Sequence, residues 1–131
     1  PRRGVGNPLL ERTKAFALRI VRLCRNLPHG RVEHMIASQL LRSGTSVGAN
    51  YRAACRARSV AEFRAKLGIV EEEADESIFW IELIAESGIM PHRRLTELLK
   101  EANEILAMVV ASIKTSRAHS DNADSRRSPP R

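Results

Sequence analysis

Three carboxylates in the acidic run "EEEADE" come closest to an arrangement that could do chemistry. Glu72 precedes Asp75 and Glu76 by three and four positions, so in a helix all three lie on neighbouring turns of one face. Carboxylates placed in this way can bind a divalent cation, which would make the protein a carboxylate metalloenzyme. Di-iron bundles of that class also need a Glu-x-x-His pair on two helices, and none of the four histidines completes such a pair.

Other signatures of catalysis are weak in this chain. Cys24 and Cys55 lie far apart, have no histidine or second cysteine at metal-binding spacing, and have no evident base beside them. The stretch "GTSVGAN" lacks the Gly-Lys-Ser/Thr sequence of a phosphate-binding loop. We therefore predict a protein that is not an enzyme and that needs no cofactor and no metal.

Cysteine usage and the N-terminal residues predict the compartment. Two isolated cysteines are typical of reduced thiols in the cytoplasm. The opening "PRRGVGNP" is too short and polar for a signal peptide, and no apolar run approaches the roughly 18 residues that a membrane span needs. We expect a cytoplasmic protein with no membrane partner.

A polar stripe in residues 39–50 offers a structural explanation for the carboxylates. If two antiparallel helices meet at a turn near residues 57–59, Arg42 faces Glu76, Ser43 faces Asp75 or Ala74, and Ser46 faces Glu72. Two glycines in this stretch, Gly44 and Gly48, would let the helix backbones approach closely. The predicted polar seam, structural rather than catalytic, comprises Gln39, Arg42, Ser43, Ser46, Asn50, Glu72, Asp75 and Glu76.

Hydrophobic periodicity and helix stop signals predict four helices and no strands. Asn7 and Pro8 open the first helix, "PHG" ends it, and the second runs from about Val32 to Ala57. Ser59 caps a third that ends at Gly88, and the fourth runs from Pro91 to Ile113. Short connections then favour an all-α, antiparallel up-down-up-down four-helix bundle over residues 8–114. Residues 1–7 are expected to be flexible, and residues 115–131, which have no apolar residue larger than alanine, to form a disordered basic tail.

Charge is unevenly distributed along the chain, whose formal net charge is +7. Residues 1–66 hold fourteen Lys and Arg against three acids, whereas residues 67–104 hold three against ten. Such a basic half can bind RNA or DNA through phosphates, without sequence preference and with strong salt dependence. The open alternative is a solvated face with salt bridges to neighbouring subunits. The predicted nucleic-acid-binding residues are Arg12, Arg19, Arg22, Arg52, Arg56, Arg58, Arg64 and Lys66.

The segment "IFWIELI", residues 78–84, is apolar on nearly all sides of a helix. One side of a helix in a four-helix bundle faces water, so Phe79, Trp80 and Leu83 are candidates for an interface between subunits. For Trp80, a position in the ordinary core is an equally good explanation.

Two long stretches resemble a known family. "QLLRSGTSVGANYRAACRARS" and "EFRAKLGIVEEEADESIFWIELIAESG" are similar to the four-helix-bundle proteins encoded in intervening sequences of 23S ribosomal RNA genes. One departure is "NYRAA", where the family commonly has Asn-x-x-Glu-Gly, and it makes the local surface more basic. The matching positions are Gln39, Arg42, Ser43, Ser46, Val47, Asn50, Arg58, Ser59, Glu62, Phe63 and Glu76.

The resemblance implies a homo-oligomer, typically a pentameric ring of bundles. It also connects the chain to the accessory proteins of diversity-generating retroelements, which bind nucleic acid and a reverse transcriptase. Two functions are therefore expected to compete: direct binding of RNA or DNA, and an adaptor role in which the basic surface docks a reverse transcriptase or another acidic protein.

Overall fold

The protein consists of four long helices, seen here in a computed structural model that describes the backbone of residues 7–127 and the side chains of residues 7–118. Over this described part there are no strands. The helices are α1 (Pro8–Arg25), α2 (Arg31–Cys55), α3 (Val60–Glu86) and α4 (Thr96–Arg127), with a short 3₁₀ turn, η1 (His92–Arg94), before the last. None of these helices has both the length and the hydropathy needed to cross a membrane.

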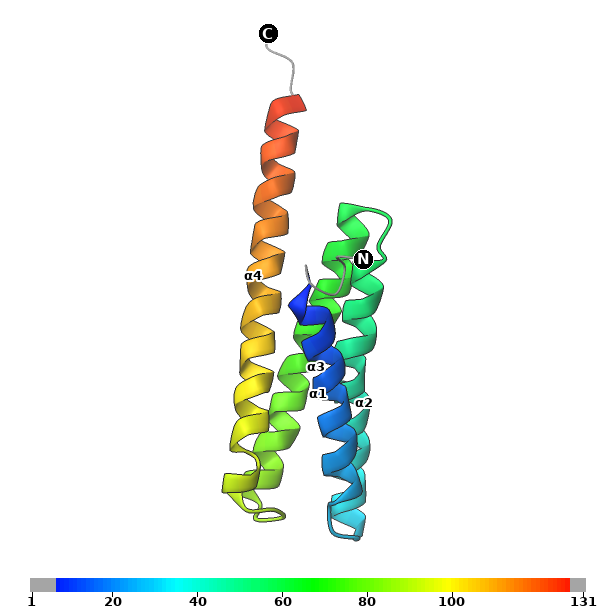
Figure 1. The fold of residues 1–131 in the computed structure, drawn as a ribbon, viewed down its shortest axis with the longest axis vertical. Coiled ribbons are helices and arrows are strands. Elements are labelled where there is room, and N and C mark those ends of the chain that lie inside the picture. Colours follow the sequence, from blue (N-terminus) through cyan, green and yellow to red (C-terminus); the bar gives the residue numbers. More distant parts are fainter. Residues whose placement is uncertain (1–6, 128–131) are drawn as a thin grey trace.

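The four helices form a bundle in which α1 packs on α2, α2 on α3, α3 on α4, and α4 on α1. Figure 1 shows them lying along one long axis and joined at alternating ends. Side-chain hydrogen bonds agree with this arrangement, since Tyr51 near the end of α2 reaches Asn7, and Cys24 near the end of α1 reaches the Ala37 carbonyl. The expected all-α class is confirmed.

Three of the predicted helix boundaries coincide with side-chain or backbone caps. The Asn7 side chain accepts a hydrogen bond from the Leu10 amide (3.3 Å) beside Pro8, and the Ser59 hydroxyl accepts one from the Glu62 amide (3.0 Å). Gly88 follows α3 with φ +79°, a conformation that favours glycine.

The predicted start of the fourth helix, at Pro91, comes before the observed start of α4 at Thr96. Pro91 precedes η1 rather than α4, because the Arg94 and Leu95 amides bond three residues back, to the Pro91 and His92 carbonyls.

The core is an apolar column to which every helix contributes. Its largest members have less than 2% of their surface exposed, and each such side chain stabilises the fold by roughly 1.5–3 kcal/mol. They include Phe16 and Ile20 from α1, Leu40 from α2, Leu67, Ile81 and Ile84 from α3, and Ile105 from α4.

Two glycines of α2 allow the close helix approach that the sequence predicts, but the helix that approaches is α1 rather than α3. A Cβ atom on Gly44 would stand 2.7 Å from Ile20 Cγ1, and one on Gly48 would stand 3.1 Å from the Thr13 carbonyl oxygen. Any larger residue at Gly44 would have to displace a buried, β-branched side chain. The glycines therefore set the spacing between α1 and α2.

The tail predicted to be disordered from residue 115 is instead helical as far as Arg127. No proline or glycine interrupts residues 115–127, and a helix that is already nucleated in the bundle extends at little cost per residue. Figure 1 shows this part of α4 reaching beyond the ends of the other helices. Residues 1–6 of the predicted flexible segment, and residues 128–131 of the predicted tail, lie outside the described residues.

Candidate nucleic-acid interface

The polar seam between α2 and α3 contains the Arg42–Glu76 ion pair that the sequence predicts. Arg42 also contacts Glu73, at 3.1 Å. The Arg42 guanidinium donates a longer hydrogen bond, of 3.4 Å, to the Gln39 side chain. Deeper in the interface the Ser77 hydroxyl donates to Ser43 (3.0 Å), and both hydroxyls are fully buried. This seam ties α2 to α3.

Other predicted pairs in the seam are wrong. Ser43 meets Ser77 instead of Asp75 or Ala74, while Glu72 and Asp75 are exposed to solvent. The Ser43–Ser77 bond lies two to three residues beyond the predicted partner, and Figure 1 shows α3 beginning beyond the end of α2. Within α2, the Asn50 side chain donates to the Ser46 carbonyl (3.0 Å).

Glu76 is held as a charged group in the seam. The Trp80 indole donates to it at 3.0 Å, and Arg42 pairs with it from α2. The Trp80 hydrogen bond, followed by that of Arg42, lowers the pKa of Glu76. Among residues 7–118, no three His, Cys, Asp or Glu side chains are placed to hold a metal ion together. Glu76 thus takes part in the seam between α2 and α3, whereas Glu72 and Asp75 are exposed to solvent.

Arg12 is engaged on the other side of α1, in a second ionic cluster. Its guanidinium makes two hydrogen bonds to Glu101, of 2.5 and 3.1 Å, and one of 2.9 Å to Glu104. The first of these partners contributes most to raising the pKa of Arg12, and Arg12 in turn lowers the pKa of Glu101. Arg19 also lies close enough to Glu101 to lower that pKa. Arg12, a predicted nucleic-acid contact, is therefore better explained as a tie between α1 and α4, with Arg19 beside it.

An open groove of about 1060 Å³ lies between α1 and the second half of α2. Leu10 and Ala17 of α1 line it together with Gly48 and Ala49 of α2, so its floor is shallow and apolar. Gly48 sits against the α1 backbone and keeps the floor narrow. The groove therefore follows directly from the close approach of the two helices.

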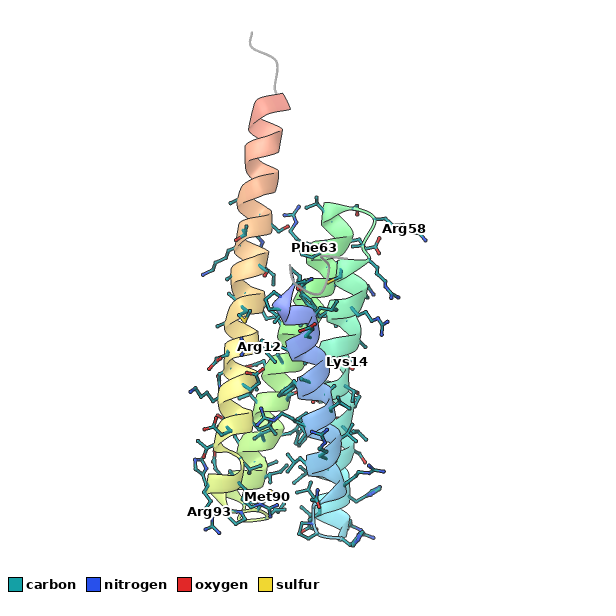
Figure 2. The ribbon with its side chains drawn as sticks, viewed as in Figure 1. Arg12, Lys14, Arg58, Phe63, Met90 and Arg93 are labelled. Atoms are coloured by element: carbon teal, nitrogen blue, oxygen red, sulfur yellow. The ribbon has the colours of Figure 1, made fainter. Side chains whose placement is uncertain are left out.

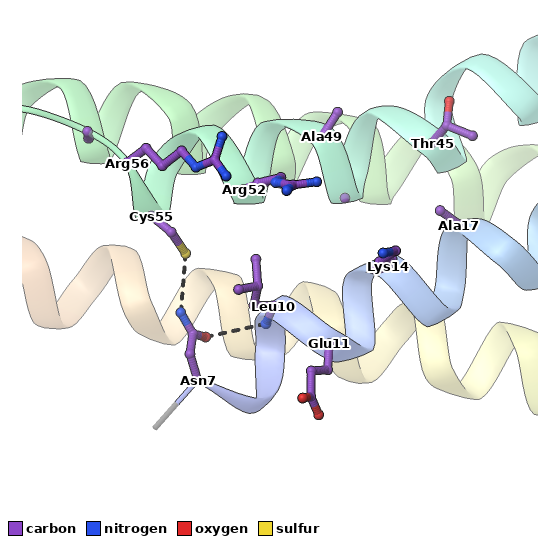
Figure 3. Close-up of a pocket in the computed structure, with 12 residues that line it drawn as sticks. Asn7, Leu10, Glu11, Lys14, Ala17, Thr45, Ala49, Arg52, Cys55 and Arg56 are labelled. Atoms are coloured by element: carbon purple, nitrogen blue, oxygen red, sulfur yellow. Dashed lines mark hydrogen bonds between the residues drawn. The ribbon is translucent and has the colours of Figure 1, made fainter. Parts of the chain in front are cut away.

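Cationic side chains surround this groove. Arg52 and Arg56 extend from successive turns of α2, and Lys14 lies across from them on α1 (Figure 3). The one acid in the lining, Glu11, points away from α2 in that view. Lys14 was not among the predicted residues. The available signal was its helical spacing from Leu10 and Ala17, which line the same groove from α1.

The remaining predicted cations are divided between two regions. Arg58 is exposed in the α2–α3 connection, and Arg64 and Lys66 are half-buried on the first turns of α3. Figure 2 shows Arg58 at one end of the bundle and Arg93 at the other. Arg22 is exposed on α1, below the groove. The structure thus places Lys14, Arg52 and Arg56 around the groove and Arg58 in the adjoining α2–α3 connection, and we call these four residues the basic end.

A polar cluster closes the groove near the start of α1. Asn7 donates to the Cys55 sulfur (3.2 Å) and accepts from the Tyr51 hydroxyl (2.8 Å). Burial, followed by the nearby Cys55 thiol, raises the pKa of Tyr51 to about 12. Tyr51 is only 7% exposed, so its ring is not available to stack on a nucleic-acid base. The basic end consequently offers charge to phosphates rather than a platform for bases.

The predicted oligomer residues are placed differently from one another. Phe79 is 53% exposed on the outer side of α3, in an edge-to-face contact with Trp80 at 4.9 Å between ring centres. Trp80 and Leu83 are partly buried and pack against the core. Phe79 alone of the three therefore stands fully on the surface.

Comparison with known proteins adds two findings. A family model described as 23S rRNA-intervening sequence protein matches residues 8–111. A crystal structure of a protein of unknown function from Bacteroides thetaiotaomicron VPI-5482, assigned to the S23 ribosomal protein family, superposes with a TM-score of 0.77 at 35% sequence identity. That match covers 81% of this chain and 98% of the other. Among proteins with curated descriptions, none matches the chain significantly.

Proposed function

This chain belongs to the 23S rRNA-intervening sequence protein family, and from its geometry we propose that it is a non-enzymatic protein that binds RNA or DNA through the basic end. The observation that carries the proposal is the gathering of Lys14, Arg52 and Arg56 around one open groove, with Arg58 exposed in the adjoining α2–α3 connection. All four side chains are exposed, so they can reach phosphate oxygens without breaking the fold.

Carboxylates within the protein compete with phosphates for the arginine side chains, and this competition also favours the basic end. Arg12 and Arg42 are each bound to two carboxylates, and releasing either would leave acids without partners. Exposed guanidinium groups at the basic end bind phosphate by releasing counterions, with little cost in desolvation. Since Tyr51 is buried, binding is expected to be independent of base sequence.

The same proposal includes assembly. We propose that the up-down-up-down bundle is the protomer of a ring-like homo-oligomer, as the family resemblance implies, with Phe79 as an exposed apolar anchor. A ring would repeat the basic end around one axis, and several weak phosphate sites on one particle bind a long strand with much higher avidity than one site alone. The two free cysteines are consistent with the cytoplasm as its compartment.

Fluorescence anisotropy with a labelled single-stranded RNA and a double-stranded DNA, over a series of salt concentrations, tests the nucleic-acid function. The substitutions Arg52→Ala, Arg56→Ala and Arg58→Ala together should weaken binding to every sequence and lower the slope of log K against log salt by about 2–3. Binding by the wild type that is unchanged in this variant would refute the basic end as the site, and no binding at low salt would refute the function.

A matched control removes three cations from the opposite end of the bundle. Arg93→Ala, Arg94→Ala and Lys100→Ala delete the same charge from exposed positions on η1 and α4 (Figure 2). If binding reflects only net charge, both triple variants lose the same affinity. If the basic end is the site, the control retains a salt slope close to that of the wild type.

One feature of the groove favours the adaptor role as a second candidate. Apolar side chains, Leu10 and Ala17 among them, form a floor between cations, which suits an acidic segment with a few apolar residues, such as one on a reverse transcriptase. Competition distinguishes the candidates. If the groove is an adaptor site, the protein partner should bind there whether or not RNA is present. If the groove is a nucleic-acid site, bound RNA should be released only when the contacts to its phosphates are lost.

A further inference from the structure

The groove between α1 and α2 has cations on both of its rims and no aromatic ring on its floor. Lys14 stands on α1, across from Arg52 and Arg56 on α2 (Figure 3). The described residues that line the groove include no Phe, Tyr, Trp or His. Phosphates can therefore be bound from two sides here, whereas a nucleic-acid base finds no ring on which to stack.

Aromatic side chains elsewhere in residues 7–118 do not take over this role. Phe16 and Tyr51 are buried in the core, and Phe63 is half-buried and packs against it. Within this described part, Phe79 is the one aromatic side chain that is mostly exposed. Phe79 and the half-buried Trp80 both lie on the second half of α3, whereas the groove is lined by α1 and the second half of α2.

The uncharged polar side chains of the groove are already used within the protein. Asn7 donates to the Cys55 sulfur and accepts from the Tyr51 hydroxyl. The Thr45 hydroxyl donates to the Leu41 carbonyl, at 2.7 Å, in its own helix. These contacts hold both side chains in place, so the groove offers a nucleic acid chiefly the positive charge of its rims.

The shape of the groove suits a sugar–phosphate backbone. A Cβ atom on Gly48 would stand 3.1 Å from the Thr13 carbonyl oxygen, so the two helices leave no room below the floor. An unpaired base placed on such a shallow floor stays largely in water. A backbone can lie along the groove instead, with its phosphates toward the cations and the carbon atoms of its sugars toward Leu10 and Ala49.

Charge density favours a double helix over a single strand. The α2 rim of the groove, from Thr45 to Arg56, is about 16 Å long. Over this length a double helix carries about ten phosphates and one stacked strand about five, since the spacing is roughly 1.7 Å and roughly 3.4 Å per charge. The bases of a double helix are also stacked on each other already, so a floor without rings costs a duplex nothing.

We propose that the ligand of the basic end is a double helix, of RNA or of DNA, with one of its two backbones seated along the groove between α1 and α2. The proposal rests on the nucleic-acid function proposed above and names the form of the ligand. RNA and DNA duplexes share the phosphates that the rims contact, so both are bound and their base pairs stay closed. A single strand of either kind binds more weakly, because its charges are wider apart and its bases lack a stacking partner.

Counterion release gives the expected size of the preference. If each of the four cations of the basic end neutralises one phosphate, log K falls with log salt by about 3.6 on a duplex and by about 2.8 on a single strand. Relative to the ratio at about 1 M salt, this difference makes the duplex about sixfold tighter at about 0.1 M. The preference should therefore shrink steadily as salt is added.

Fluorescence anisotropy with labelled probes of equal length tests the proposal. The probes are an RNA duplex, a DNA duplex, and one unstructured single strand of each. At about 0.1 M salt, the wild type should bind each duplex at least about fivefold more tightly than its single strand, and the ratio should fall at higher salt. A single strand bound as tightly as its duplex would overturn the proposal, and so would a ratio that does not change with salt.

A ring introduced into the floor supplies a second test. Ala49 is exposed in the groove, and Ala49→Tyr gives a single strand the stacking partner that it lacks, which should raise the affinity for the strand roughly fivefold or more. The matched control, Ser38→Tyr, adds the same ring at an exposed position of α2 outside the groove and should keep the wild-type ratio. Circular dichroism establishes that both variants are folded, and the salt series on the wild type needs neither. Equal affinity of the two variants for the single strand would contradict the role given to stacking.

Failure of this proposal is separable from failure of the nucleic-acid function. If single strands bind as tightly as duplexes, and all binding is weakened by the Arg52, Arg56 and Arg58 substitutions, only the preference for a double helix is wrong. If none of the probes binds at low salt, the nucleic-acid function itself is wrong.

Discussion

Replacing two mid-helix glycines by alanine should change stability in opposite directions. Gly44 in α2 faces Ile20, whose Cγ1 and Cγ2 atoms would stand 2.7 and 2.8 Å from a new Cβ. Gly68 in α3 has no atom within 4 Å of the corresponding position. Both substitutions gain about 1 kcal/mol in helix propensity.

Only Gly44→Ala also incurs overpacking, which costs about 1–3 kcal/mol in a tight core. The atoms in its way belong to the branched root of a completely buried Ile20, so a rotamer change cannot clear them. We expect Gly44→Ala to lower the free energy of unfolding by up to about 2 kcal/mol, and Gly68→Ala to raise it by up to about 1 kcal/mol. A difference of this size corresponds to several degrees in melting temperature, at roughly 4 °C per kcal/mol.

Urea unfolding followed by circular dichroism measures both effects, and a double-mutant cycle isolates the contact. Ile20→Ala removes both clashing atoms, so Gly44→Ala should become stabilising in that background. Equal effects of the two glycine substitutions, or no coupling between positions 20 and 44, would refute the explanation of Gly44 as a spacing device.

Three further predictions concern the polar contacts. Arg12→Met should cost about 1 kcal/mol in urea unfolding, since it breaks the hydrogen bonds to Glu101 in a partly buried site. Because Arg12 lowers the pKa of Glu101, that stabilisation is complete above the ordinary glutamate pKa of about 4.3 and is lost as pH falls through the lowered value. The wild type should therefore lose more stability than Arg12→Met between about pH 5 and pH 3, and equal losses would contradict the role of this pair. Ser43→Ala should cost about 1 kcal/mol because it leaves the buried Ser77 hydroxyl without one partner, and adding Ser77→Ala should recover part of the loss; a cost that simply doubles would show that the two hydroxyls act independently.

The sequence predicts those features of the fold that depend on local pattern. The caps at Asn7 and Ser59 and the left-handed Gly88 follow from residue type and spacing, and so does the apolar stripe through Phe16 and Ile20. Gly44 and Gly48 pointed correctly to a close helix contact, although its partner is α1 rather than α3.

Features that depend on how one helix is displaced against another were harder to predict. The path of the α2–α3 connection moved the partner of Ser43 from Asp75 to Ser77, a displacement that no local pattern encodes. Similarly, nothing in the sequence distinguishes Arg12 from Arg52 as a phosphate contact. Of the two, Arg12 is the one that pairs with carboxylates on α4, almost ninety positions away in the chain. Three of the four residues of the basic end could thus be listed in advance, but the residues available for binding could not be separated from those already paired.

The overhang of α4 makes the two ends of this molecule unequal. Residues 114–127 continue the helix for about 20 Å past Ile113, the last buried residue of α4, and they leave the bundle at the end where Arg56 and Arg58 lie. In any assembly that keeps the bundles parallel, every such extension of α4 emerges from the same side. A strand approaching from that side meets the α4 extensions together with Arg56 and Arg58, whereas the opposite side has the exposed Arg93 and Arg94 but no helix extension, so the two sides of the particle differ.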